Sequence, residues 1–216
     1  MARKFYFSSS AVPSIAPAFD SGWADTAQAV VRTMPIAADS SAMVVKNYDN
    51  VPIVSSRLMY QFISPAIAAQ TITGTMQFVI KSFANGGSMS WTFRVRVLSG
   101  DGLTVRGTLI SLSMTVASGT PFNTVTFGTI SNVNGGAFSI TSTDAQDGDV
   151  IVVEMGLLNG NLSTDDAQAQ IGADGGSDYT FTNAQTTDLN PWVNFSQTIT
   201  MAPLTNSTNR FLMIMR

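Results

Sequence analysis

The sequence contains no cysteine and no histidine among its 216 residues. Without cysteine there is no disulfide framework, no thiolate metal site and no thiol nucleophile. Without histidine there is no imidazole for Ser-His-Asp or Cys-His catalysis or for the common zinc sites. These absences exclude the commonest nucleophilic and zinc-dependent enzymes, so we expect a non-catalytic protein without a cofactor.

Charged side chains are also scarce, at 12% of the chain with a formal net charge of −3. This is about half the usual fraction, so Thr, Ser, Asn and Gln must supply the polar surface. Such a surface suits a protein that is held against neighbours, and we expect a homo-oligomer or a larger assembly.

Long apolar runs are absent as well. No segment approaches the 18 consecutive apolar residues of a membrane span, and we expect no membrane association. Serines and Pro13 interrupt the stretch between the basic start and Ala16–Ala18, so it lacks the apolar region of a secretory signal.

What the sequence does contain is alternation of apolar and polar residues. Trp91–Val97 alternates with the period of a half-buried strand, and so does 71–80. The turn residues Asn85–Ser88 between them predict a β-hairpin. The apolar parity then shifts near Gly107, which predicts a β-bulge there.

Further strands are predicted at 122–130, 137–142, 149–158 and 191–201, whereas helical patterns are confined to 24–33 and one turn at 163–166. Short strands with Gly, Asn, Asp or Pro between most of them indicate an all-β protein. We expect an antiparallel, jelly-roll-like β-sandwich with at most one short helix. We expect a single domain over 1–216, with an N-terminal extension (about 1–25) and a C-terminal arm (about 202–216).

Acidic loops are the candidate metal sites. Carboxylate oxygens on flexible loops suit calcium, and the candidate ligands are Asp147, Asp149, Asp174 and Asp178. Their spacing matches no EF-hand, and Asp-Gly is common in turns. We therefore interpret them as turn residues and expect no bound metal.

The single glutamate, Glu154, lies within an apolar strand. A buried carboxyl could serve glycoside hydrolysis, but that chemistry needs a second carboxylate nearby, and no partner is evident. The alternative is that Glu154 faces solvent or pairs with an arginine.

Three arginines, Arg94, Arg96 and Arg106, are predicted on the outward faces of two neighbouring strands. Guanidinium groups neutralise phosphates, yet no aromatic residue is interleaved to stack on bases, and the protein is acidic overall. We expect no nucleic-acid binding. We expect either a protein-contact patch or internal partners for the acidic half of the chain.

The C-terminal arm ends in five consecutive apolar residues between Arg210 and Arg216. An exposed segment of this kind would aggregate, so it should be docked. It could be an edge strand of its own sandwich or add to a neighbouring subunit, and we favour the neighbour. The partner-contact candidates in it are Phe211, Leu212, Met213, Ile214 and Met215.

Five motifs occur in order along nearly the whole chain: Lys4–Ser9, Pro17–Trp23, Arg94–Gly102 continued by Val105–Leu109, Asp147–Gly156, and Asp188–Ser196. In this order they resemble segments of virion structural proteins of tailed bacteriophages. The resemblance implies a sandwich fold in a virion assembled in the host cytoplasm, with no catalytic residues to transfer.

We therefore expect a capsid decoration or cement protein that bridges subunits of the major capsid protein or other virion proteins. The alternative is a tail or fibre component that binds host glycans. Jelly-roll sandwiches bind sugars through aromatic platforms, and Tyr179 and Trp192 are the candidates for such contacts.

Overall fold

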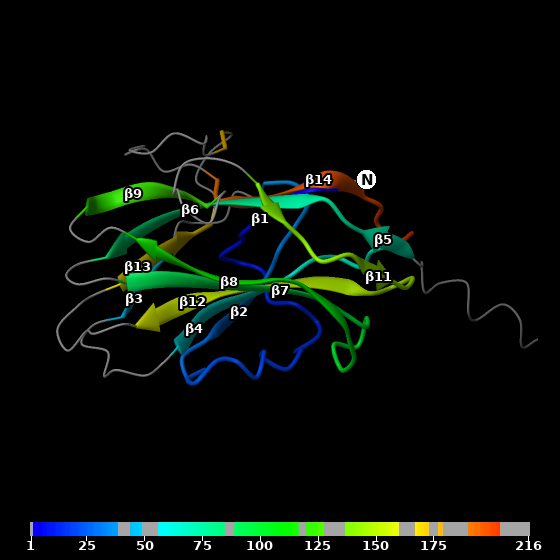
Figure 1. Ribbon diagram of the computed structural model, residues 1–216, viewed down its shortest axis with the longest axis horizontal. Coiled ribbons are helices and arrows are strands. Elements are labelled where there is room, and N and C mark those ends of the chain that lie inside the picture. The colour runs from blue at the N-terminus through cyan, green and yellow to red at the C-terminus, as the bar shows by residue number, and fades with distance from the viewer. Residues whose placement is uncertain are drawn as a thin grey trace, which may run out of the picture.

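The computed structural model describes residues 2–38, 44–48, 56–84, 89–116, 120–127, 137–159, 167–172, 177–178 and 190–203. These residues form strands and connecting loops and contain no helix (Figure 1). The prediction of an all-β sandwich is therefore confirmed. The helix considered at 24–33 is wrong, because this segment contains the strand β2 (Val30–Thr33). The turn considered at 163–166 lies outside the described residues.

The first sheet is antiparallel and is organised around its longest strand, β6 (Thr75–Ala84). The order across the sheet is β1-β14-β6-β13-β3, and β9 and β10 also pair with β6. The remaining strands are β1 (Ala2–Tyr6), β3 (Val44–Tyr48), β9 (Thr120–Phe127), β10 (Phe138–Ser139), β13 (Ala167–Ile171) and β14 (Trp192–Ile199).

The second sheet has the order β2-β4-β12-β7-β8, and its only parallel pair is β2 with β4. Its further strands are β4 (Ser56–Ile63), β7 (Met89–Leu98), β8 (Val105–Val116) and β12 (Val150–Asn159). A two-stranded ribbon of β5 (Gln70–Ile72) and β11 (Thr143–Ala145) lies at one end of the sandwich (Figure 1).

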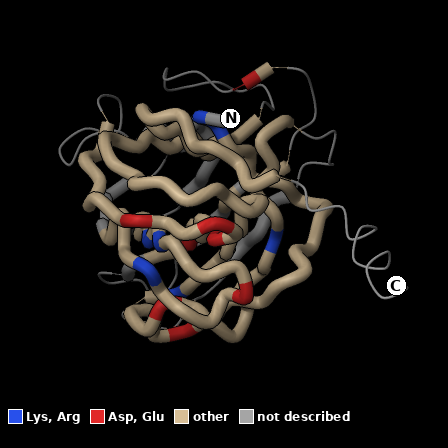
Figure 2. Tube along the Cα trace, turned by 90° about the vertical axis from the view of Figure 1, so that its right-hand side faces the viewer, with Lys and Arg blue, Asp and Glu red and all other residues tan. Residues whose placement is uncertain are grey.

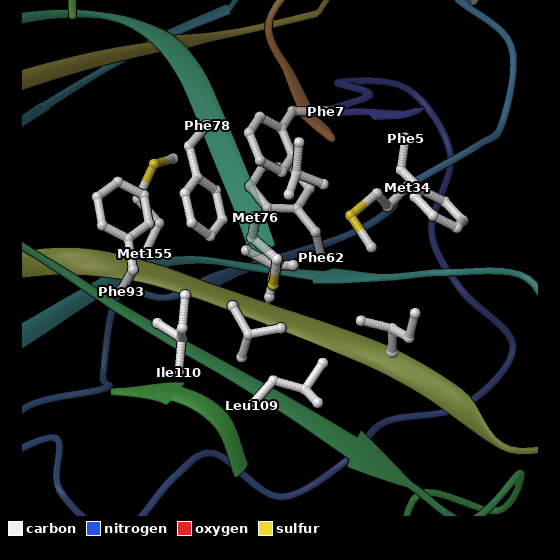
Figure 3. Close-up of a cluster of buried hydrophobic side chains, with 14 of the residues drawn as sticks. Phe5, Phe7, Met34, Phe62, Met76, Phe78, Phe93, Leu109, Ile110 and Met155 are labelled. Carbon is white, nitrogen blue, oxygen red and sulfur yellow. The ribbon is translucent and has the colours of Figure 1, made fainter. Parts of the chain in front are cut away.

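The hairpin predicted between 71–80 and Trp91–Val97 is wrong. The two segments belong to β6 and β7, which lie in different sheets. Their inward faces meet across the core instead, where the rings of Phe78 and Phe93 stack with centroids 4.8 Å apart (Figure 3). Alternation identifies the buried face of a strand but not its hydrogen-bonded neighbour, which explains the error.

The bulge predicted near Gly107 is confirmed. The register of β7 with β8 shifts between Val95 and Arg96 and again between Val97 and Leu98, and Gly107 pairs with Val97 between the two shifts. A Cβ at Gly107 would lie 2.6 Å from the Thr143 hydroxyl, so glycine lets the ribbon strand β11 approach β8.

The core between the sheets is aromatic and rich in methionine (Figure 3). The second sheet is also covered on its outer face, where Val152, Leu98 and Val31 of the sheet pack with Ile15 of the N-terminal segment. The alternate residues of β7 are buried there too, which is why Thr92 and Arg96 are inaccessible. No helix in the described residues has the length and hydropathy to cross a membrane.

Phe78→Ala should lower the free energy of unfolding by about 3–5 kcal/mol, because it removes a fully buried ring that contacts the opposite sheet. Chemical denaturation measures the effect. Leu103→Ala is the control, because Leu103 is 80% exposed and its truncation should change stability by at most roughly 0.5 kcal/mol. Equal effects for the two variants would contradict the placement of the core.

Candidate functional site

The most strongly polar site in the interior is built on Glu154 of β12. Inward-pointing neighbours along this strand, such as Val153 and Met155, belong to the core between the sheets. Glu154 points to the opposite face, yet its side chain has an exposed fraction of 0%. An ionised carboxylate in such a place is tolerated only if partners replace the lost water.

Strand register supplies two of these partners. Gln61 on β4 lies directly opposite Glu154 and donates from Nε2 to Oε1 over 2.9 Å. Arg96 on β7 lies diagonally across and donates from Nη2 to the same oxygen over 2.6 Å. Both strands flank β12, so the carboxylate is bound from either side within the sheet.

The N-terminal segment supplies the remaining donors from above the sheet. The Trp23 indole donates from Nε1 to Glu154 Oε2 over 2.7 Å. The backbone N–H of Asp20 lies 3.1 and 3.2 Å from the two carboxylate oxygens. Both oxygens of Glu154 are thus engaged by hydrogen bonds.

A second carboxylate, Asp20, completes the charge balance. Its Oδ1 lies 3.0 Å from Nη1 of Arg94, and its Oδ2 lies 3.7 Å from Nε of Arg96. Two carboxylates therefore face two guanidinium groups. We call this group the Glu154 cluster: Asp20, Trp23, Gln61, Arg94, Arg96 and Glu154. Figure 2 shows acidic and basic positions of separate segments coming together in this way.

Glycines allow the N-terminal segment to approach so closely. A Cβ at Gly22 would lie 2.4 Å from the guanidinium of Arg94, which also stands over the Trp23 ring at 5.3 Å. A Cβ at Gly156 on β12 would lie 2.7 Å from that ring and 2.1 Å from the carbonyl oxygen of Arg57. The close fit fixes Trp23 on the sheet.

The same segment is fastened again where it meets the start of β4. Asp25 forms an isolated parallel bridge with Arg57, and their side chains form an ion pair of 2.7 Å. Ser56 accepts hydrogen bonds from Ala24 N–H and donates from its hydroxyl to the carbonyl oxygen of Gly22. Residues 17–25 therefore lie over the outer face of the second sheet as a fixed cover.

This geometry does not suit glycoside hydrolysis. That reaction needs a carboxyl group that can reach the substrate and exchange a proton with it, together with a second carboxyl group about 5 to 10 Å away. Glu154 is inaccessible, and the nearby Asp20 pairs with arginine. The alternative reading, that Glu154 pairs with an arginine, is the one that the structure bears out.

The three arginines were predicted to form a protein-contact patch or to have internal partners in the acidic half of the chain, and each has an internal carboxylate partner. Arg96 is 4% exposed and pairs with Glu154, so it does not lie on an open outer face as predicted. Arg94 pairs with Asp20, and Arg106 pairs with Asp149 over 3.1 Å. The covering N-terminal segment is the reason, because it turns the outer face of β7 into a second interior.

The predicted acidic loops are only partly described. Asp149 is buried, accepts the Gln146 N–H over 2.8 Å and pairs with Arg106, as a turn residue does. Asp147 is exposed in the same turn, and Asp174 lies outside the described residues. Among those that the structure describes, no group of three or more Asp, Glu, His or Cys could hold a metal ion.

Asp178 has a separate role at the edge of the first sheet. Its Oδ2 accepts hydrogen bonds from Lys4 Nζ over 2.5 Å and from the Tyr6 hydroxyl over 3.2 Å. Asn190 donates to its other oxygen. Asp178 therefore ties strand β1 to the residues that precede β14.

The glycan candidate Trp192 is not an open platform. It is 4% exposed, packs on Val79 with Tyr6 alongside, and has Lys4 Nζ 4.5 Å above its ring. Tyr179 and the apolar arm residues Phe211–Met215 lie outside the described residues.

A groove that the sequence did not reveal lies at one end of the sandwich. Its volume is about 420 Å³, and no charged side chain lines it. Its walls come from loops and strand ends far apart in the sequence: Pro13, Ser14, Ile15, Thr33, Pro35, Ile63, Ser64, Pro65, Ala66, Gly100, Gly148 and Val150. No single stretch carries a signal for it, because each loop contributes only a few residues.

Exposed apolar side chains stand next to these walls. Val12, which precedes Pro13, is 71% exposed, and Leu103, in the turn that contains Gly100, is 80% exposed. The groove and these residues form the apolar end of the sandwich. Apolar side chains exposed beside an uncharged groove are typical of a contact site.

No family model and no curated protein matches the chain. Among solved structures, a CocE/NonD-family hydrolase from Staphylococcus aureus aligns with a TM-score of 0.46 and 10% identity, over 76% of this chain and 34% of the hydrolase. The structure of infectious bursal disease virus Gx strain aligns with a TM-score of 0.17 and 11% identity, over 92% of this chain and 52% of the viral one. The chain thus spans about a third and about half of these two proteins, and neither alignment bears on function.

Glu154→Gln should lower the free energy of unfolding by about 3–5 kcal/mol, because it leaves Arg96 buried beside an uncharged amide. In a double-mutant cycle, Arg96→Met in the Glu154→Gln background should cost much less than Arg96→Met alone. Asp147→Asn is the matched control for an exposed acid, with an expected change of at most roughly 0.5 kcal/mol. Additive costs would show that the pair is not coupled.

Alkaline pH should weaken the edge of the first sheet. Burial, followed by the charge of Asp178 and the hydrogen bond to it, raises the pKa of Tyr6 from 10.0 to about 12. Between these values the folded state keeps a proton that the unfolded state has lost, so the free energy of unfolding should fall as the pH rises from 10 to 12. Unfolding curves of wild type and Tyr6→Phe measure this effect. The difference in their free energies of unfolding should be constant at and below neutral pH, and the wild-type value should fall relative to that of Tyr6→Phe between pH 10 and 12. A constant difference throughout the alkaline range would contradict the assignment.

Proposed function

We propose that this protein is a non-catalytic structural component of a bacteriophage virion, most specifically a capsid decoration or cement protein that bridges capsid subunits. The observation that carries the proposal is the apolar end of the sandwich. The charged groups of the Glu154 cluster are paired internally, whereas this end presents a groove lined by uncharged residues and exposed apolar side chains, with Asp101 and Asp147 at its rim.

The motifs behind the resemblance to phage virion proteins support a structural role. Pro17–Trp23, Arg94–Gly102 and Asp147–Gly156 are far apart in the sequence, yet all three contribute to the Glu154 cluster. Their most distinctive polar residues therefore hold the cover segment on the sheet. This use of the motif residues is what a structural role would require.

The composition of the apolar end fits a protein interface. The fully buried centre of an interface is depleted in charged residues, and the groove lining has none. Val105, the first residue of β8, is 50% exposed and adds another exposed apolar side chain close to Leu103 in the sequence. A neighbouring protein seated here would bury side chains that otherwise face water.

Glycan binding by a tail or fibre protein remains the alternative. It needs an exposed aromatic ring beside polar groups. Trp192 is covered by its neighbours, so this residue offers no support for the glycan reading. Tyr179 lies outside the described residues and adds no argument.

The proposal is tested by following the protein into particles made in the phage host. Particles purified on a density gradient should carry the protein at a fixed ratio to the major capsid protein, including capsids that lack tails. Leu103→Asp should reduce incorporation by about tenfold or more, because an unpaired charge in an apolar interface costs more than 1.4 kcal/mol.

Ser139→Asp is the matched control. It adds the same charge at an exposed position of β10, in the other sheet, and should leave incorporation unchanged. Both variants should melt at the wild-type temperature. Absence from purified particles would overturn the proposal, and a few copies confined to tailed particles would favour the alternative.

A further inference from the structure

The described chain ends beside the groove. After β14, Met201 forms a bridge with Ile67, and Ala202 N–H donates to the carbonyl oxygen of Ala66 over 3.0 Å. Ala66 is part of the groove wall. The chain therefore runs antiparallel to 66–68 and reaches Pro203 at the edge of the groove.

The next six residues can return the chain to the groove. Residues 204–209 span at most about 20 Å when extended. A connection of this length is long enough to turn back toward Pro203 and the groove beside it. Connections of about six residues are common, and Asn206, Ser207 and Asn209 are turn-forming types.

The segment that follows matches the groove in polarity. Phe211–Met215 is wholly apolar and contains two methionines, whose flexible side chains fit irregular surfaces. The groove is uncharged, and its volume of about 420 Å³ lies in the range of pockets that bind apolar groups.

The flanking charges match as well. Arg210 and Arg216 bracket the apolar residues. Exposed Asp101 and Asp147 stand next to Gly100 and Gly148 of the groove wall. The Asp101 carboxylate is kept ionised by the Ser99 hydroxyl, whose hydrogen bond lowers its pKa.

We propose that Arg210–Arg216 of the same chain docks in the groove, with Phe211–Met215 on its apolar walls and the two arginines at the acidic rim. Its own chain is the occupant because the short spacer holds the segment at a high effective concentration beside the groove. The inference does not depend on the virion role: the segment would fill the groove, and the exposed side chains of Val12, Leu103 and Val105 would stay available to a neighbouring protein. The sequence alone favoured docking of this segment on a neighbouring subunit. The structure favours the groove of the same chain, because Pro203 follows Ala202, which is hydrogen-bonded to Ala66 of the groove wall.

Disulfide trapping tests this directly, because the natural chain has no cysteine. Ser14→Cys places a thiol on the groove wall, and Met213→Cys places one in the segment. In the purified full-length double variant, mild oxidation should give a monomer that migrates faster on a non-reducing gel, with a yield independent of protein concentration. A disulfide requires Cβ atoms about 3.5–4.5 Å apart, so it reports close contact.

Ser139→Cys with Met213→Cys is the matched control, since Ser139 is exposed on the other sheet. It should cross-link at least about tenfold less. A covalent dimer as the main product would overturn the proposal in favour of a neighbouring copy. A yield equal to that of the control would overturn it outright.

Charge insertion supplies a second readout in the full-length chain. Leu212→Asp with Ile214→Asp, added to the Ser14→Cys and Met213→Cys pair, should lower the cross-linking yield about tenfold, because charges would enter an apolar groove. Thr205→Asp with Thr208→Asp in the spacer should leave it unchanged. If the spacer changes were as harmful as the segment changes, apolar docking would be wrong. Particle incorporation is measured separately, so failure of this test leaves the virion proposal standing.

Discussion

The burial of one carboxylate, that of Glu154, is the constraint on which much of the fold depends. Removing an ion from water costs several kcal/mol even after the protein relaxes, and only close partners offset that cost. Here the partners come from both flanking strands and from a segment more than 130 positions away in the sequence. The N-terminal cover is therefore a requirement of the sheet's chemistry rather than an appendage.

The side chains that hold the fold together differ from those that are available for contacts. The polar residues that attract attention in the sequence, Glu154 and the three arginines, are used to hold the chain together. The surface available for contacts is of the opposite character, apolar and assembled from loops. The proposed structural role is consistent with this separation, because one set of side chains holds the fold together and another is available to neighbours.

Sequence periodicity predicted the local features well and the long-range features poorly. The inward face of 91–97 and the bulge at Gly107 follow from alternation and its change of parity, both of which are properties of a few adjacent residues. The hairpin failed because β6 and β7 face each other across the core, which no local pattern encodes. For the same reason, the pattern at 24–33 allowed a short helix, whereas Val30–Thr33 pairs as a strand with β4, which is not adjacent in the sequence.

The candidate site shows the same limit. The sequence predicted an acid in one strand and arginines on a neighbouring strand, and it allowed that they pair. It did not predict the N-terminal segment that buries them, because the close approach of that segment depends on Gly22 and Gly156. The groove was invisible altogether, since its wall residues carry meaning only once the loops are brought together.

The pairing of β1 with β14 has a consequence for how the chain is made. The ribosome produces Ala2–Tyr6 first, and about 190 residues must follow before the partner strand Trp192–Ile199 exists. At synthesis rates of about 5–20 residues per second, this takes roughly 10 to 40 s. Throughout that interval Phe5, which is buried in the finished core, lacks the strand that pairs with β1. β1 therefore cannot take its place in the first sheet until β14 has been synthesised.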